Sequence, residues 1–117
     1  MKIILIVEDI DLNIDLLTQI LEDEYALVVA KDGARGVALA EEKSPDLVIM
    51  DIALPVMDGY EASRRIRAKF PTMPILGLSS HAMAGDAEKA KAAGCNDYLT
   101  KPIDEDLLRA RIRELLG

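Results

Sequence analysis

The sequence predicts an α/β fold in which five parallel strands form one doubly wound, flavodoxin-like sheet with helices on both faces. The first observation is a series of five short apolar runs that end in polar residues, which is typical of buried parallel strands. The second is that segments with helical spacing lie between and after these runs, so each strand is followed by a helix. This alternation implies right-handed crossovers, and the common order of five such strands is 2-1-3-4-5.

Each element has its own local signal. The strands are the apolar runs themselves, at residues 3–7, 26–30, 47–50 and 75–78, with a weaker fifth around Tyr98 and Leu99. Helices are indicated by apolar residues that recur every three or four positions, most clearly Ile14, Leu17 and Leu21 in the first and Leu108, Ile112 and Leu115 in the last. Aspartates at the start of helical segments are predicted N-caps, namely Asp11, Asp58 and Asp104. The alanine-rich stretch 82–93 has high helix propensity but few large apolar groups, which predicts a weakly anchored fourth helix.

The composition favours a single cytoplasmic domain that spans residues 1–117. Half of the chain is apolar, which is enough to build one core at this length. The net charge of −7 repels nucleic-acid phosphates, so we expect no direct binding to DNA or RNA. The one cysteine, Cys95, cannot form an internal disulfide, and no stretch resembles a signal peptide or a membrane span. Met1 is compatible with a stand-alone protein and equally with a domain cut from a longer chain.

Polar residues stand at the predicted carboxyl ends of four strands. Ligands of doubly wound sheets bind at these ends, where the winding direction reverses between strands one and three. The residues found there are Glu8 and Asp9 after strand one, Asp51 after strand three, Ser79 after strand four and Lys101 after strand five. Strand ends share one rim of the sheet, so we expect these side chains to converge.

Three converging carboxylates repel one another and require a cation. Mg²⁺ fits, because it prefers oxygen ligands from one or two carboxylates, water and phosphate. With the metal bound, Asp51 could attack a phosphoryl donor and form an aspartyl phosphate. Lys101 would then place a positive charge on the phosphoryl oxygens, and the Ser79 hydroxyl would donate a hydrogen bond to them.

Four motifs in order give the whole chain a resemblance to the receiver domain of two-component response regulators. They are Val7-Glu8-Asp9, the segment 50–59 from Met50-Asp51 to Asp58-Gly59, the segment 78–83 that begins Leu78-Ser79, and the segment 94–102 that ends Lys101-Pro102. Any one of these motifs alone is a weak signal, whereas four in the right order are specific.

The resemblance implies a role for each residue of the acidic cluster. Asp51 would be the phosphoacceptor, Asp9 and Asp51 would bind Mg²⁺ directly, Glu8 would act through water, and the Ala53 carbonyl would be a further ligand. In the family, the positions of Ala53 and His81 also tune how long the phosphorylated state lasts. The chain departs from the commonest family pattern at Ile10, Ala53, Leu54 and Ser80, and the lifetime of the phosphorylated state stays open.

The resemblance also implies a readout. Lys101 and Ser79 would contact the phosphoryl group, and the peptide bond between Lys101 and Pro102 would be cis. Ser79 would move toward the phosphoryl group while Tyr98 swings from an exposed to a buried rotamer. The face formed by helix four, strand five and helix five would then change for protein binding, as a shift between two packings. Donor and target would be a phosphohistidine on a histidine kinase or phosphotransfer protein, and a downstream protein or a covalently attached effector.

Several alternatives stay open from the sequence. Glu8 and Asp9 could cap the first helix, Ser80 offers a second hydroxyl beside Ser79, and Tyr98 could be a simple edge-strand aromatic. A haloacid-dehalogenase-type phosphatase would need a second aspartate where Ala53 stands, and a flavin or nucleotide binder would need a glycine-rich loop after strand one. An interaction module that no longer takes phosphate is the remaining alternative. On the receiver interpretation the chain is not an enzyme, beyond catalysing its own phosphorylation and dephosphorylation.

Overall fold

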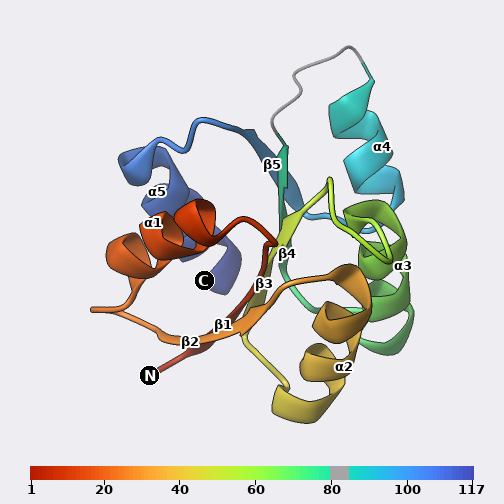
Figure 1. The fold of residues 1–117 in the computed structure, drawn as a ribbon, viewed down its shortest axis with the longest axis horizontal. Coiled ribbons are helices and arrows are strands. Elements are labelled where there is room, and N and C mark those ends of the chain that lie inside the picture. The colour runs from red at the N-terminus through yellow and green to blue at the C-terminus, as the bar shows by residue number, and fades with distance from the viewer. Residues whose placement is uncertain (80–84) are drawn as a thin grey trace.

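The structure, a computed structural model, describes residues 1–79 and 85–117 (Figure 1). Its five strands are all parallel and are ordered β2-β1-β3-β4-β5, which confirms the predicted topology. The strands are β1 (Ile3–Val7), β2 (Ala26–Ala30), β3 (Leu47–Asp51), β4 (Ile75–Ser79) and β5 (Asp97–Thr100). The helices are α1 (Asp11–Leu21), α2 (Gly33–Lys43), α3 (Gly59–Lys69), α4 (Asp86–Ala92) and α5 (Glu105–Leu116).

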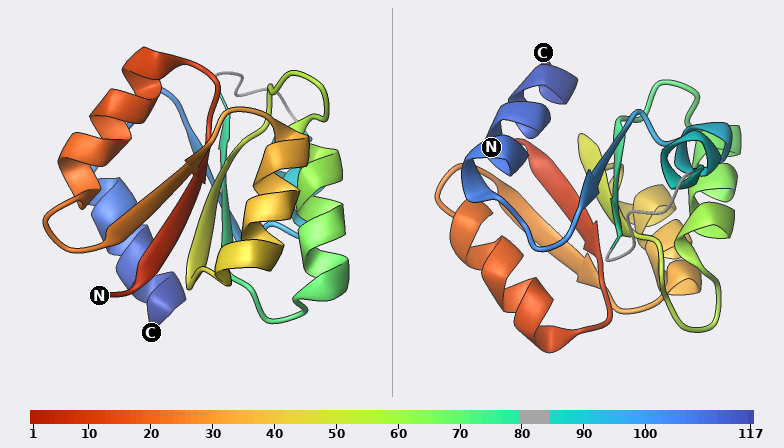
Figure 2. Two further views of the ribbon diagram at one scale, coloured as in Figure 1. Left: turned by 60° about the horizontal axis from the view of Figure 1, so that its bottom comes forward. Right: turned by 90° about the horizontal axis from the view of Figure 1, so that it is seen from above.

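The helices form two layers that enclose the twisted sheet. Figures 1 and 2 show α1 and α5 on one face, and α2, α3 and α4 on the other. Apolar residues of α1 and α5 pack on Ile4, Ile6 and Ile49, while the second core, under the other three helices, contains Leu5, Val7 and other strand residues. Neighbouring residues of the central strands therefore serve opposite cores, which explains why their sequences are continuously apolar.

Two strands are one residue longer than their apolar runs. Asp51 is the last residue of β3 and lies opposite Leu78, while Ser79 is the last residue of β4 and lies opposite Thr100. Strand pairing thus continues one residue beyond each apolar run, so the sheet itself fixes the backbones of Asp51 and Ser79. The helix patterns are confirmed more directly, because the predicted core position Leu17 is fully buried in α1.

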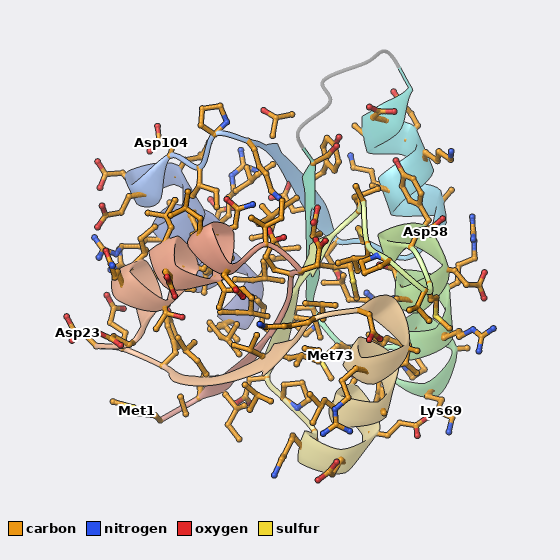
Figure 3. The ribbon with its side chains drawn as sticks, in the orientation of Figure 1. Met1, Asp23, Asp58, Lys69, Met73 and Asp104 are labelled. Atoms are coloured by element: carbon orange, nitrogen blue, oxygen red, sulfur yellow. The ribbon has the colours of Figure 1, made fainter. Side chains whose placement is uncertain are left out.

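Two of the three predicted N-caps are confirmed. The Asp58 carboxylate accepts a hydrogen bond of 2.9 Å from the Glu61 amide, and the Asp104 carboxylate accepts one of 3.1 Å from the Leu107 amide. Each bond satisfies an amide that has no partner within its helix. Figure 3 labels both aspartates, which stand before α3 and α5.

The prediction that Asp11 caps α1 is wrong. The N-cap position belongs to Ile10, and no side chain caps this end of the helix. Asp11 is the first helical residue, and its carboxylate instead pairs with Lys31 at 2.7 Å. Glu8 holds the preceding turn, because its Oε2 accepts hydrogen bonds from the amides of Asp9 and Ile10. The alternative that Glu8 and Asp9 cap the first helix is therefore wrong, because Glu8 binds amides that precede the first helical residue.

The fourth helix is described only from Asp86 onward. Residues 82–84 of the predicted helical stretch, together with Ser80 and His81, lie outside the described residues. Within α4 the one buried residue is Ala90, which agrees with the scarcity of large apolar groups in the sequence. Among the described residues, no helix combines the length and apolar character that crossing a membrane requires.

Candidate functional site

The three predicted carboxylates converge at the carboxyl ends of β1 and β3. Glu8, Asp9 and Asp51 each offer an oxygen, and these oxygens all lie within 4.8 Å of one another. Asp51 is fixed by strand pairing, and Glu8 follows β1, its amide donating to the Ala30 carbonyl at 2.9 Å. Both side chains are almost fully enclosed, with 1% of Glu8 and 3% of Asp51 exposed. The cluster is thus a buried concentration of negative charge at the predicted edge of the sheet.

Lys101 bridges two of these carboxylates. Its Nζ lies 2.8 Å from Glu8 Oε1 and 3.5 Å from Asp51 Oδ1, although Glu8 and Lys101 stand 93 residues apart in the chain. The Lys101–Pro102 peptide bond is cis, as the resemblance implied. Ser79 is buried beside this segment, and its carbonyl accepts a hydrogen bond of 2.7 Å from the Lys101 amide. The structure therefore places Glu8, Asp9, Asp51 and Lys101 together, with the backbone of Ser79 beside Lys101, while their roles stay predictions.

The environment shifts the pKa values of the two buried acids in opposite directions. Burial, followed by the neighbouring charge of Glu8, raises the pKa of Asp51 to about 6, and the Lys101 charge only partly opposes this. Burial also opposes ionisation of Glu8, but hydrogen bonds with Lys101 and Asp51 outweigh it and lower the pKa of Glu8. Burial disfavours the charged lysine, yet its contacts with both carboxylates leave the pKa of Lys101 raised. The ion pair is therefore mainly that of Glu8 with Lys101.

The residues present fit a divalent cation. Asp9 Oδ1 is buried and has no hydrogen-bond partner among the described residues, which is costly for a carboxylate oxygen unless a cation binds it. Asp51 and Glu8 place further oxygens beside it, and all three are the hard ligands that Mg²⁺ prefers. Ala53 lies against the same cluster, because its amide donates to Asp51 Oδ1 at 3.4 Å.

Tyr98 lies in β5, close to the cluster but outside it. Its side chain is half-buried and packs against the core under α2, α3 and α4. A Cβ atom added at Gly77 would come within 3.5 Å of the Tyr98 ring and 3.3 Å of Cys95 Sγ. The Tyr98 side chain is thus half-buried, and its role as a switch stays a prediction.

Sequence reasoning missed Gly59, which allows α3 to approach the end of β3 closely. Its amide donates to the Ile52 carbonyl at 2.9 Å, and a Cβ at this position would lie only 2.2 Å from the Asp51 carbonyl oxygen. No side chain larger than hydrogen fits there without a backbone shift. The available signal was the Asp58-Gly59 pair at the start of a predicted helix.

Fold and site together define a class, a doubly wound α/β domain with a lysine-bridged acidic site at the point where the winding reverses. The particular family follows from comparison with known proteins. The model of the response regulator receiver domain matches residues 4–113, and the chain belongs to this family. Receiver domains of two-component systems serve phosphorylation-dependent signalling and act as switches rather than as classical enzymes.

The similar proteins include both small and large members of the family. The chain is 36% identical to the protein PilH of Pseudomonas aeruginosa, over 97% of each chain. It is also 36% identical to the response regulator PleD of Caulobacter vibrioides, where the match covers 96% of this chain but 25% of PleD. Among solved structures, the chain is similar to the receiver domain of a Pseudomonas aeruginosa sensor histidine kinase, which has a magnesium ion in its active-site cleft. The TM-score is 0.92 at 37% identity, and the match covers 99% of this chain and 98% of that one. A CheY-like receiver domain from Methanospirillum hungatei has a TM-score of 0.93 at 31% identity, covering 99% of this chain and 94% of that one.

Proposed function

We propose that residues 1–117 form one receiver domain, in which Asp51 accepts a phosphoryl group from a phosphohistidine on a histidine kinase or phosphotransfer protein. The observation that carries this proposal is the buried Asp51 carboxylate, held at the end of β3 beside Glu8, Asp9 and Lys101. An isolated buried acid would be a defect in a core. Three carboxylates and a lysine together at the ligand edge of the sheet instead suit metal-dependent phosphoryl transfer.

Mg²⁺ would be held by Asp9 and Asp51 directly, by Glu8 through water and by the Ala53 carbonyl. The unpartnered Asp9 oxygen and the three clustered carboxylates support this assignment, as does the magnesium ion in the cleft of the related kinase receiver domain. When bound, the metal neutralises the carboxylates and attracts the oxygens of the incoming phosphoryl group.

The chain's own residues would carry the transfer. A carboxylate oxygen of Asp51 attacks the phosphorus, an O–P bond forms, and the P–N bond breaks with its electron pair returning to the donor imidazole. A pKa of about 6 leaves Asp51 mostly ionised at neutral pH, so no base has to deprotonate it. Lys101, already 3.5 Å from Asp51, would place its charge on the phosphoryl oxygens, and the Ser79 hydroxyl would donate to them. Water attack on the aspartyl phosphate would reset the domain.

A protein donor is supported by exposed apolar side chains on the segments that follow β1 and β3. Ile10 follows Asp9 directly and is 51% exposed, and Leu12 in the first turn of α1 is 77% exposed. Val56, in the segment that follows Asp51, is 86% exposed. Exposed apolar groups on segments that adjoin the charged cluster suit contact with another protein. The donor's phosphohistidine would enter between these segments.

The readout would follow from movement of Ser79 toward the phosphoryl group and of Tyr98 toward the core. The Tyr98 side chain is half-buried against the core that includes Ala90 of α4, so a change in its burial would be felt at that face. The surface of α4, β5 and α5 would change as a result, for binding by a downstream protein or a covalently attached effector.

Intact-mass measurement after incubation with Mg²⁺ and acetyl phosphate tests the proposal. We expect the gain of one phosphoryl group, which is lost in Asp51→Asn and in EDTA. Asp58→Asn is the matched control, because Asp58 is exposed, follows the same strand and retains its capping ability as asparagine. A wild-type protein that gains no phosphoryl group, from acetyl phosphate or from a phosphohistidine donor, would contradict the proposal and favour a phosphate-independent interaction module.

A further inference from the structure

The first turn of α3 is in direct contact with the backbone of the acceptor residue. Gly59 approaches so closely that an added Cβ would lie 2.2 Å from the Asp51 carbonyl oxygen. The Gly59 amide also donates to the Ile52 carbonyl at 2.9 Å. A displacement of the backbone at Asp51 would therefore press directly on the first turn of α3.

The next residue, Tyr60, reaches from α3 to α4. Its ring is half-buried against the core, and Lys89 Nζ lies 4.8 Å from the ring centroid. A lysine ammonium over a tyrosine face is attracted by the ring's electrons. The contact matters more here than on a well-anchored helix, because Ala90 is the one buried residue of α4.

Tyr60 also faces β5. Tyr60 and Tyr98 pack against the same core, together with Cys95 and Ala90. Burial raises the pKa of the Tyr60 phenol, and the next causes in order are Asp86 on α4 and Tyr98 on β5. The phenol is thus close to ionisable groups on both elements that the proposed readout would move.

We propose that Tyr60 is a positioning residue, which holds α4 through Lys89 and connects it to Asp51 through Gly59. This route differs from the one through Ser79 and Tyr98, because it runs along α3. It rests on the proposed function, since it assigns a second mechanical connection between the acceptor and the readout face. Contact alone does not demonstrate coupling, so the test is a double-mutant cycle.

The first measurement is amide hydrogen exchange of residues 86–92 in the protein without phosphate or metal. We expect Lys89→Met to accelerate exchange about two- to fivefold, the range that loss of an exposed cation–π pair gives. In a Tyr60→Leu background, Lys89→Met should have no further effect. Tyr60→Phe retains the ring and should resemble the wild type. Lys91→Met is the matched control, because Lys91 is exposed on the same helix and has no ring contact among the described residues.

Equal acceleration by Lys89→Met in both backgrounds, or none beyond that of Lys91→Met, would overturn the pairing of Tyr60 with Lys89. If Tyr60→Leu fails to fold, the comparison of Lys89→Met with Lys91→Met still decides whether the pair holds α4.

The second measurement uses beryllofluoride with Mg²⁺ as a probe for the phosphorylated state. In Lys89→Met we expect the probe to bind as in the wild type, while the amide shifts that it induces at residues 86–92 become at least twofold smaller. If Lys89→Met binds the probe like the wild type and shows the same amide shifts, the route along α3 is refuted and the proposed function is not affected. A wild-type protein that does not bind the probe would refute the proposed function and this route together, so the two failures are distinguishable.

Discussion

Replacing Asp51 with asparagine should stabilise the metal-free protein. In the folded state this carboxyl group has a pKa of about 6, raised first by burial and then by the charge of Glu8. A raised pKa means that the folded protein binds the proton more tightly than the unfolded chain does. Ionisation of Asp51 therefore costs stability, starting as the pH rises above its ordinary value of 3.8 and reaching its full extent above about 6.

The size of the effect follows from these two values. The difference between 3.8 and about 6, at 1.36 kcal/mol per pH unit, corresponds to about 3 kcal/mol in the free energy of unfolding. The attraction of Lys101, 3.5 Å away, is already included in that pKa, but the buried asparagine amide needs hydrogen-bond partners of its own, which offsets part of the gain. We therefore expect Asp51→Asn to gain about 1–3 kcal/mol at pH 7.5 and roughly half of that at pH 5, where the wild-type group is mostly protonated.

Urea unfolding in EDTA at both pH values measures this gain. The matched control is Asp23→Asn, because Asp23 is exposed in the turn after α1, at the periphery of the molecule (Figure 3). This control removes the same formal charge from a chain of net charge −7 and should change stability by less than about 0.5 kcal/mol. A gain that is the same at pH 5 and pH 7.5, or that Asp23→Asn reproduces, would refute the reasoning.

Three further predictions concern the same site. Mg²⁺ at ten times its dissociation constant should raise the free energy of unfolding of the wild type by about 1.4 kcal/mol, and Asp9→Asn should lose most of this increase in the same urea assay. Lys101→Met removes the positive charge that opposes protonation of Asp51, so the pKa of Asp51 should rise above about 6 in a carboxyl NMR titration without metal. An unchanged pKa would show that the lysine does not act on Asp51. Gly59→Ala should lower the free energy of unfolding by about 1–3 kcal/mol or more, because the new Cβ would lie 2.2 Å from the Asp51 carbonyl oxygen. A variant as stable as the wild type would show that the backbone can shift to accommodate the Cβ.

The sheet was predictable because each buried strand is marked by its own apolar run in the sequence. The runs 3–7 and 26–30 coincide with β1 and β2, and strict alternation with helices determined the order of all five strands. Prediction of the acidic cluster followed from the same rule, since residues at the carboxyl ends of parallel strands must share one edge. This is why Glu8 and Lys101 could be placed together despite the length of chain between them.

The contacts that escaped prediction depend on tertiary geometry. Asp11 has the right residue type for an N-cap, but the position of Lys31 at the end of β2 and the hydrogen bonds of Glu8 decide which residue begins α1. The close approach of Gly59 and the pairing of Tyr60 with Lys89 arise only when α3 packs against the sheet and α4 against α3. A single sequence contains the residues of such contacts without a local pattern that marks them.

The charges of the site explain why a domain of this kind tolerates a costly cluster in its interior. Three carboxylates and one lysine leave a formal charge of −2 when all are ionised, and a magnesium ion supplies the +2 that balances it. Without metal the protein relieves this imbalance only in part, by pairing Lys101 with Glu8 and by raising the pKa of Asp51. A bound cation would therefore relieve repulsion that the folded protein has when the cluster is empty. On this argument the stability sacrificed at Asp51 is what makes the domain responsive, and a variant that restores stability there should lose the switch.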